Sequence, residues 1–184
     1  PERGYVLDTL ELNHAVANAS YAISADGRYA FLLDGYLLIV DPDNLEVIHS
    51  EMLSTELEDG QIAAYGHRFI ITGTENSRFT GHMGYYTTTY SSDGQCQRFY
   101  TNQTAKKAQT EWGYLQVLDQ YTKGNMIYTL LKTNWDHYLS VYDAEEDIFT
   151  IKELPYKYTS FVPSADGEQL FLQDTAYFYL QPVK

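Results

Sequence analysis

Residues 24–34 read Ser-Ala-Asp-Gly-Arg-Tyr-Ala-Phe-Leu-Leu-Asp, and residues 164–174 read Ser-Ala-Asp-Gly-Glu-Gln-Leu-Phe-Leu-Gln-Asp. The two stretches lie 140 residues apart, and eight of their eleven positions are identical or both apolar. A turn followed by an apolar run that recurs along a chain is typical of repeat architectures. The recurrence therefore predicts a fold built from similar units, and two unrelated hairpins with similar turns are the plainer alternative.

The Ser-x-Asp-Gly start of each stretch predicts a tight turn between two strands. Asp26 and Asp166 can accept hydrogen bonds from backbone amides just downstream in such a turn. The glycine that follows each aspartate supplies the positive φ that lets the chain reverse with the right twist. We expect a strand before each turn and a buried strand after it, at 29–33 and 169–173.

Length and composition favour one all-β domain over residues 1–184. The chain has 184 residues, with 18 tyrosines and 8 phenylalanines, and aromatic residues suit pleated sheet more than helix. No apolar run reaches the length of about 18 residues that a membrane-spanning helix needs. We therefore expect a single domain without a transmembrane helix.

The charge balance limits the kinds of partner. There are 25 acidic and 12 basic residues, so the formal net charge is −13, which disfavours nucleic acid and anionic membrane surfaces. Plain solubility is the simplest interpretation, and attraction of a basic partner is the alternative. The single cysteine, Cys96, does not indicate a cellular compartment.

Residues 21–50 divide into four expected strands joined by short turns. The Asp34-Gly35 pair is a two-residue hairpin signal, and Pro42 lies early in the next turn. A looser unit follows over 58–100, with an expected long connection from Gly73 to Met83. Long connections in repeat arrays often lie where the array binds a partner.

A third unit over 110–154 repeats the order of strands, and a fourth begins at Tyr158 with only three strands. The segment Tyr5–Leu12 reads as a strand without a sequence neighbour. We expect this strand to pair with 176–180, because closure of a ring removes an exposed sheet edge. The sequence thus predicts four units of about four antiparallel strands.

The Ser-Ala-Asp-Gly turn, the Phe-Leu-Leu run and the Tyr-Leu-Leu-Ile-Val-Asp strand resemble the repeats of YVTN/TolB-like (WD40-like) β-propellers. Residues 21–50 carry this resemblance well, 159–181 carry it for three strands, and 58–100 barely carry it. Such propellers usually have six to eight blades. The resemblance therefore implies a small closed ring, part of a larger propeller, or a half that pairs with another chain.

The sequence contains no local motif for catalysis. The five histidines form no His-Glu-x-x-His or His-x-His pattern, and no Gly-x-Ser-x-Gly elbow or phosphate-binding loop is present. We expect no catalytic residues, no metal and no cofactor. A site gathered at the propeller axis from several units would leave no such motif, so an enzyme or enzyme subunit of hydrolase or dehydrogenase large-subunit type is the alternative.

Aromatic side chains are the remaining candidates for binding. Large rings with polar tips suit interfaces and shallow ligand sites, although they also fill spaces between blades. The predicted binding residues are Trp112, Trp135, His137, Tyr85 and Tyr86. The function that the sequence favours is a non-enzymatic binding scaffold for a protein or small ligand, with a basic partner or a homo-oligomer as further options.

Overall fold

The computed structural model describes residues 19–53, 57–76, 83–100, 116–166, 169–174 and 178–182. These residues form fifteen strands in four antiparallel sheets, which confirms the all-β prediction. No helix in these ranges is long and apolar enough to cross a membrane. The first sheet contains β1 (Ala19–Ile23), β2 (Tyr29–Leu33), β3 (Tyr36–Val40) and β4 (Val47–Met52).

The other sheets continue in chain order, each with its strands in sequence order. The second sheet contains β5 (Leu57–Tyr65), β6 (Arg68–Asn76), β7 (Met83–Ser91) and β8 (Cys96–Tyr100). The third contains β9 (Gln116–Lys123), β10 (Met126–Lys132), β11 (His137–Asp143) and β12 (Ile148–Leu154). The fourth contains β13 (Ser160–Pro163), β14 (Gln169–Gln173) and β15 (Phe178–Pro182).

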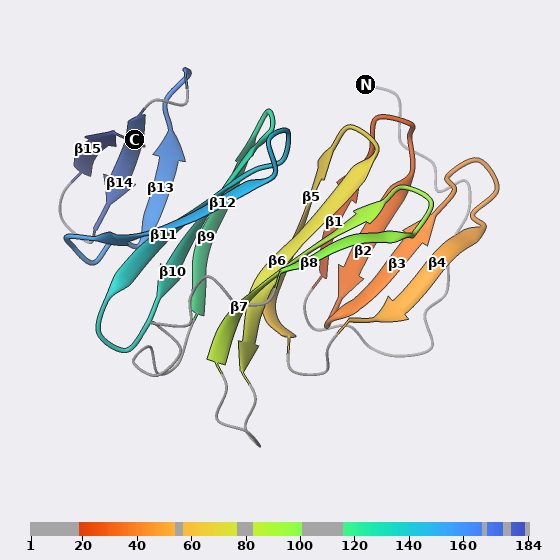
Figure 1. Cartoon of the computed structure of the whole chain (residues 1–184), viewed down its shortest axis with the longest axis horizontal. Helices are drawn as coiled ribbons and strands as arrows, with labels where there is room; N and C mark the ends of the chain where they lie inside the picture. Colours follow the sequence, from red (N-terminus) through yellow and green to blue (C-terminus); the bar gives the residue numbers. More distant parts are fainter. Residues whose placement is uncertain are drawn as a thin grey trace, which may run out of the picture.

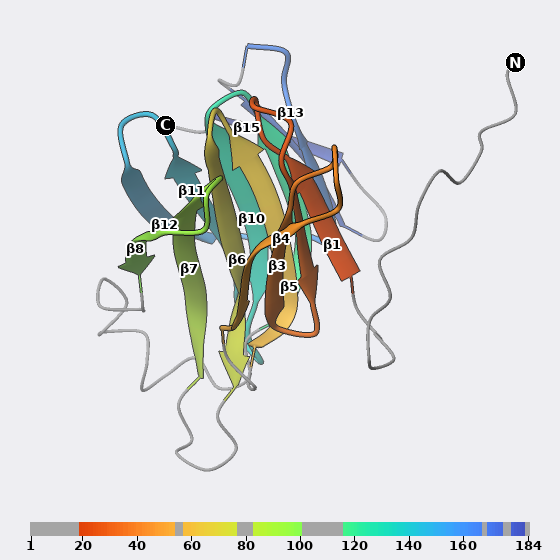
Figure 2. The ribbon, with the colours of Figure 1, turned by 90° about the vertical axis from the view of Figure 1, so that its right-hand side faces the viewer.

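The four sheets stand side by side in a row, as Figure 1 shows. The first strand of each sheet contacts the first strand of the next, so β1, β5, β9 and β13 form the inner edge of the row. In Figure 2, turned by 90°, the sheets lie one behind another, and buried residues of neighbouring sheets pack together between them. We call the three contact zones between neighbouring sheets the first, second and third junctions.

The ring closure predicted from the sequence stays a prediction. The expected partner strand Tyr5–Leu12 lies outside the described residues, and the strand expected at 176–180 is observed as β15. Within the described part of the chain, the first and fourth sheets lie at opposite ends of the row (Figure 1).

The predicted hairpin at Asp34-Gly35 is confirmed. Both residues have positive φ, 49° and 82°, and they join β2 to β3 with the register Leu33 opposite Tyr36. This pair of left-handed conformations is that of a type I′ turn, which matches the twist of the strands it connects.

The predicted role of Asp26 in its turn is wrong. The amide of Arg28 donates to the Ser24 hydroxyl at 3.1 Å, while the Ser24 hydroxyl donates to the Asp26 carboxylate. Serine therefore accepts the downstream amide, and the aspartate orients the serine. Ser164 accepts the amide of Gln169 at 3.0 Å in the same way, with its hydroxyl on Asp166.

The connection expected from Gly73 to Met83 is shorter than predicted, because β6 extends to Asn76 and β7 begins at Met83. The run of Thr, Gly and Glu after Ile71 did not signal a strand by its composition. Its pairing with β7 in register, Thr74 opposite Tyr85 and Asn76 opposite Met83, overrides that weak propensity.

The cores lie in the junctions. At the first junction Ala30, Leu32, Leu37 and Ile39 of the first sheet pack against buried apolar residues of the second, Leu57, Ile62, Phe69, Ile71 and Tyr90. At the third junction an apolar cluster joins Tyr128, Leu130 and Leu139 to Phe161, Leu170 and Leu172. The cluster at the second junction is smaller: Ala63, Ile70, Ile127, Tyr142 and Ala144. Burial between adjacent sheets therefore holds the row together.

Candidate functional site on the turn rim

The turns β1–β2, β3–β4, β5–β6 and β7–β8 all lie at one end of the first two sheets, which we call the turn rim. The amide of Ala25 donates to the carbonyl of Gly66 at 2.8 Å, and the amide of Ser92 donates to the carbonyl of His67 at 2.8 Å. Backbone bonds thus tie three of these turns together, one bond across the first junction and one within the second sheet. Such ties hold loop side chains in fixed positions.

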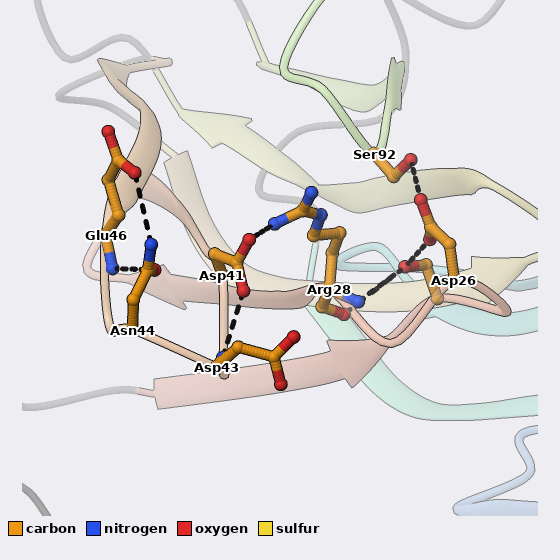
Figure 3. A network of polar contacts seen from close by, with 8 residues as sticks. Asp26, Arg28, Asp41, Asp43, Asn44, Glu46 and Ser92 are labelled. Atoms are coloured by element: carbon orange, nitrogen blue, oxygen red, sulfur yellow. Dashed lines mark hydrogen bonds and ion pairs between the residues drawn. The ribbon is translucent and has the colours of Figure 1, made fainter.

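Asp26 is the centre of the polar contacts at this rim (Figure 3). Its carboxylate accepts hydrogen bonds from the hydroxyl of Ser24 and, at 2.7 Å, from the hydroxyl of Ser92 in the second sheet. The Nδ1 atom of His67 lies 3.5 Å from the same carboxylate. Burial alone would raise the pKa of Asp26, but the hydrogen bonds from Ser24, Ser92, its own amide and His67 outweigh it and lower the pKa to about 2.

Arg28 and Asp41 form a second polar pair, next to Asp26 and within the first sheet. The Arg28 guanidinium donates to Asp41, whose other carboxylate oxygen accepts the amide of Asp43 at 2.9 Å. The Asp43 amide and the Arg28 cation lower the pKa of Asp41 below its ordinary value. In the same turn, Asn44 accepts the amide of Glu46 at 2.9 Å, which orders the β3–β4 connection (Figure 3).

These side chains surround an open hollow of about 380 Å³ on the turn rim. Its lining consists of four carboxylates, one guanidinium, one hydroxyl and two apolar side chains: Asp26, Asp41, Glu46, Asp93, Arg28, Ser92, Val47 and Ile48. The lining therefore carries three more negative than positive charges at neutral pH. A cationic group entering the hollow would meet a favourable potential and an apolar wall.

Ser92 and His67 both contact the Asp26 carboxylate: the Ser92 hydroxyl donates a hydrogen bond to it at 2.7 Å, and Nδ1 of His67 lies 3.5 Å from it. In the ranges that the structure describes, no three His, Cys, Asp or Glu side chains are placed to hold a metal ion. The residues present can pair with and orient a polar or charged ligand.

The predicted aromatic residues that the structure describes, Trp135, Tyr85 and Tyr86, do not line the hollow. Trp135 is 69 % exposed in the β10–β11 turn, at the end of the third sheet opposite the turn rim. The turn is ordered by the Thr133 hydroxyl, which accepts the amide of Asp136 at 2.9 Å. Tyr85 and Tyr86 lie on β7, and Trp112 lies outside the described residues.

His137 is close to Trp135 in the chain but is buried, with 5 % of its surface exposed. Burial lowers the pKa of His137, and the Lys132 and Lys157 ammonium groups add to this, against a hydrogen bond with the backbone of Tyr158 and the charge of Asp136. A neutral, buried histidine under a turn fits a structural role. The structure thus brings Trp135 and His137 near each other in the fold but not to the hollow.

Sequence reasoning missed the residues that line the hollow. The usable signal is a third Ser-x-Asp-Gly turn, at Ser91–Gly94. Its serine hydroxyl donates to Asp93 and accepts the amide of Gln95 at 3.1 Å, as in the other two turns. Ser24 and Ser91 each accept the amide four residues on, whereas Ser164 accepts the amide five residues on. The turn at Ser91 joins the last two strands of its sheet.

Comparison with known proteins supports the fold alone. No family model matches the chain, and no curated protein matches it. An acylaminoacyl peptidase in complex with Z-Gly-Gly-Phe-chloromethyl ketone is similar in structure over 89 % of this chain, at 11 % identity and a TM-score of 0.52. The Pyrococcus horikoshii acylaminoacyl peptidase matches over 89 % at 11 % identity and a TM-score of 0.50.

The chain spans about 30 % of the length of these two proteins, and the similar part is their β-propeller region. The row of four radial sheets, with first strands innermost, is therefore similar in structure to part of a β-propeller. At this level of identity the likeness gives no information on chemistry.

Proposed function

We propose that this domain is a non-enzymatic binding scaffold whose turn rim takes a basic partner. The observation that carries the proposal is the open hollow in which four carboxylates and one guanidinium are held by bonds within and across two sheets. A cationic peptide segment fits this lining, because lysine and arginine side chains bring a positive head and an apolar stem. The excess of acidic residues over the whole chain would add attraction at long range.

Rigidity of the rim supports the same proposal. Asp26 and Asp41 are already engaged by protein donors, so a partner need not order them on binding. Glu46 and Asp93 are the more exposed carboxylates, and they remain accessible to a ligand. A preformed surface of this kind loses little side-chain entropy on association.

We further propose that the repeats are of the YVTN/TolB-like kind. Three Ser-x-Asp-Gly turns, in each of which the serine hydroxyl donates to the aspartate, support this finer assignment. This assignment concerns the repeats alone, and the proposed binding role is tested separately at the hollow.

The test is binding of a hexa-arginine peptide, measured by isothermal titration at low and moderate salt. We expect the double variant Glu46→Gln/Asp93→Asn to weaken binding by about fivefold or more, since it removes two exposed charges from the lining. Raising ionic strength from about 50 to 300 mM should weaken binding to the unaltered protein, because exposed charges are screened.

The matched control is Glu145→Gln/Glu153→Gln, which removes two exposed carboxylates of the third sheet. This variant has the same net charge as the test variant but an intact hollow. If both double variants lose affinity equally, attraction is only by overall charge, and the hollow is not the site. Absence of peptide binding to the unaltered protein would also overturn the proposal.

A further inference from the structure

The second junction differs from its neighbours in being lined by hydroxyl groups. Ile70 of β6 packs against the third sheet, and the register places Thr89 opposite Ile70 and Thr87 opposite Thr72. Opposite residues of an antiparallel pair share one face of the sheet. Thr72, Thr87 and Thr89 therefore face the third sheet.

The third sheet presents hydroxyl groups in return. Ile127 and Tyr142 belong to the apolar cluster of the second junction and lie opposite each other on β10 and β11. Thr129 lies opposite Ser140 on the same face. Polar side chains thus meet across the junction, beside a small apolar cluster.

Some of these hydroxyls are satisfied by protein and others are not. The Thr72 hydroxyl donates to Oε1 of Gln120, which also accepts the Thr129 hydroxyl at 3.4 Å. The Oγ atoms of Thr87, Thr89 and Ser140 are buried and have no hydrogen-bond partner among the described residues. These three residues are 1 %, 2 % and 1 % exposed.

A buried hydroxyl without a partner is unfavourable, and native proteins rarely leave one so. Three such groups from two sheets at one junction therefore call for a shared ligand. The polar groups that meet across this junction are hydroxyls, the amide of Gln120 and, at the β5–β6 turn end, the guanidinium of Arg68, which already donates to the carbonyl of Ala144. The ligand they suit is small and neutral, and able both to donate and to accept hydrogen bonds.

We propose that the second junction is a binding site for ordered water, which links Thr87 and Thr89 on β7 to Ser140 on β11. A buried water molecule usually makes about three hydrogen bonds to groups that would otherwise be unsatisfied. Three hydroxyls, each able to donate one bond and accept two, match that requirement. Water is thus a structural component of this junction, in contrast to the first and third junctions, whose apolar clusters are larger.

The test uses valine, which has the shape of threonine without its hydroxyl. If water satisfies the hydroxyls, Thr87→Val and Thr89→Val each lower the folding equilibrium constant by about fivefold, because the water loses a partner. If the hydroxyls are unsatisfied, the same changes raise the constant. Thr122→Val on β9 is the control, since Thr122 is exposed and reports the intrinsic effect of valine in a strand.

A double-mutant cycle tests whether one water network joins the two sheets. Thr89→Val combined with Ser140→Ala should lower the free energy of unfolding by clearly less than the sum of the two single changes. Either change alone already disrupts the water-mediated link between the sheets. Urea unfolding gives the constants for all four proteins. The proposal is overturned if the valine variants are as stable as or more stable than the unaltered protein relative to the control, or if the two changes are additive.

Discussion

The second sheet packs against the first sheet on one face and the third sheet on the other. The two contacts differ in polarity, because side chains along β6 alternate between the two faces. Phe69 and Ile71 point into the first junction, where every member of the cluster is apolar or tyrosine. Ile70 and Thr72 point into the second junction, where threonines and Gln120 meet. Since successive strand residues face opposite ways, one strand builds one apolar contact and one polar contact.

The first junction is also fixed at its ends. Tyr90 donates to Glu51 at 2.9 Å, and its ring lies 5.6 Å from that of His49. Asp26 and Ser92 bond across the turn rim of the same junction. The hollow therefore lies over the junction that has both an apolar core and polar ties, which suits a preformed binding surface.

The largest expected effect comes from truncating adjacent isoleucines of β6. Both Ile70 and Ile71 are fully buried, but they face opposite junctions. Ile71→Ala should lower the free energy of unfolding by about 4 kcal/mol, because the apolar junction cannot fill the cavity. Ile70→Ala should cost about 2 to 3 kcal/mol, since water can enter beside hydroxyl groups.

Urea unfolding of the two alanine variants gives the comparison directly. Equal costs, or a larger cost at Ile70, would mean that the two junctions respond alike to a cavity.

The next effect concerns the glycine of the third Ser-x-Asp-Gly turn. Gly94 has φ of +87°, and a Cβ there would lie 2.4 Å from Cβ of His49 in the first sheet. Gly94→Ala should destabilise the protein by about 3 kcal/mol, through backbone strain and the clash at the first junction.

Gly124→Ala is the matched control, because Gly124 has φ of +58° and open space around its Cβ position. It should cost only about 1 kcal/mol. Thermal unfolding of both variants tests this, and similar losses would show that the His49 contact can relax.

A smaller effect depends on pH through Asp26. The folded pKa of about 2 lies below the ordinary 3.8, so the stabilisation is present above about pH 4 and is lost as pH falls towards 2. After allowance for solvent screening we expect about 1 kcal/mol. Asp26→Asn should therefore destabilise the protein at pH 7 and have little effect near pH 2.

Unfolding curves from pH 7 to pH 2 measure this difference. Ser92→Ala, which removes one donor to the carboxylate, should shift the loss to higher pH. If the difference in unfolding free energy between Asp26→Asn and the unaltered protein does not change with pH, the ionised Asp26 carboxylate does not stabilise the first junction.

The smallest expected effect is at Trp135. Its ring is largely exposed and lies away from the hollow, so Trp135→Ala should change unfolding free energy by less than about 0.5 kcal/mol. The dissociation constant for the hexa-arginine peptide should stay within about twofold of that of the unaltered protein. A marked loss of affinity would move the binding surface to the opposite end of the sheets, as the sequence first suggested.

The sequence predicted the strands and turns well where local chemistry determines them. Asp34-Gly35 gave the correct hairpin, and the continuous apolar runs at 29–33 and 36–40 gave the correct strands. These features depend on neighbours in the chain, which a sequence displays directly.

The candidate site could not be predicted in the same way. Asp26 and Ser92 are 66 residues apart, and only the packing of two sheets brings them together. The polar second junction depends on which face of β7 each threonine occupies, which follows from register. The run Thr87-Thr88-Thr89 was visible, but its division between two junctions was not.

The most direct test of the contrast between the junctions is NMR cross-relaxation between water and side-chain methyl groups. We predict long-lived water contacts at the methyls of Thr87 and Thr89 and none at the methyls of Ile71. Water contacts at both junctions, or at neither, would contradict the account.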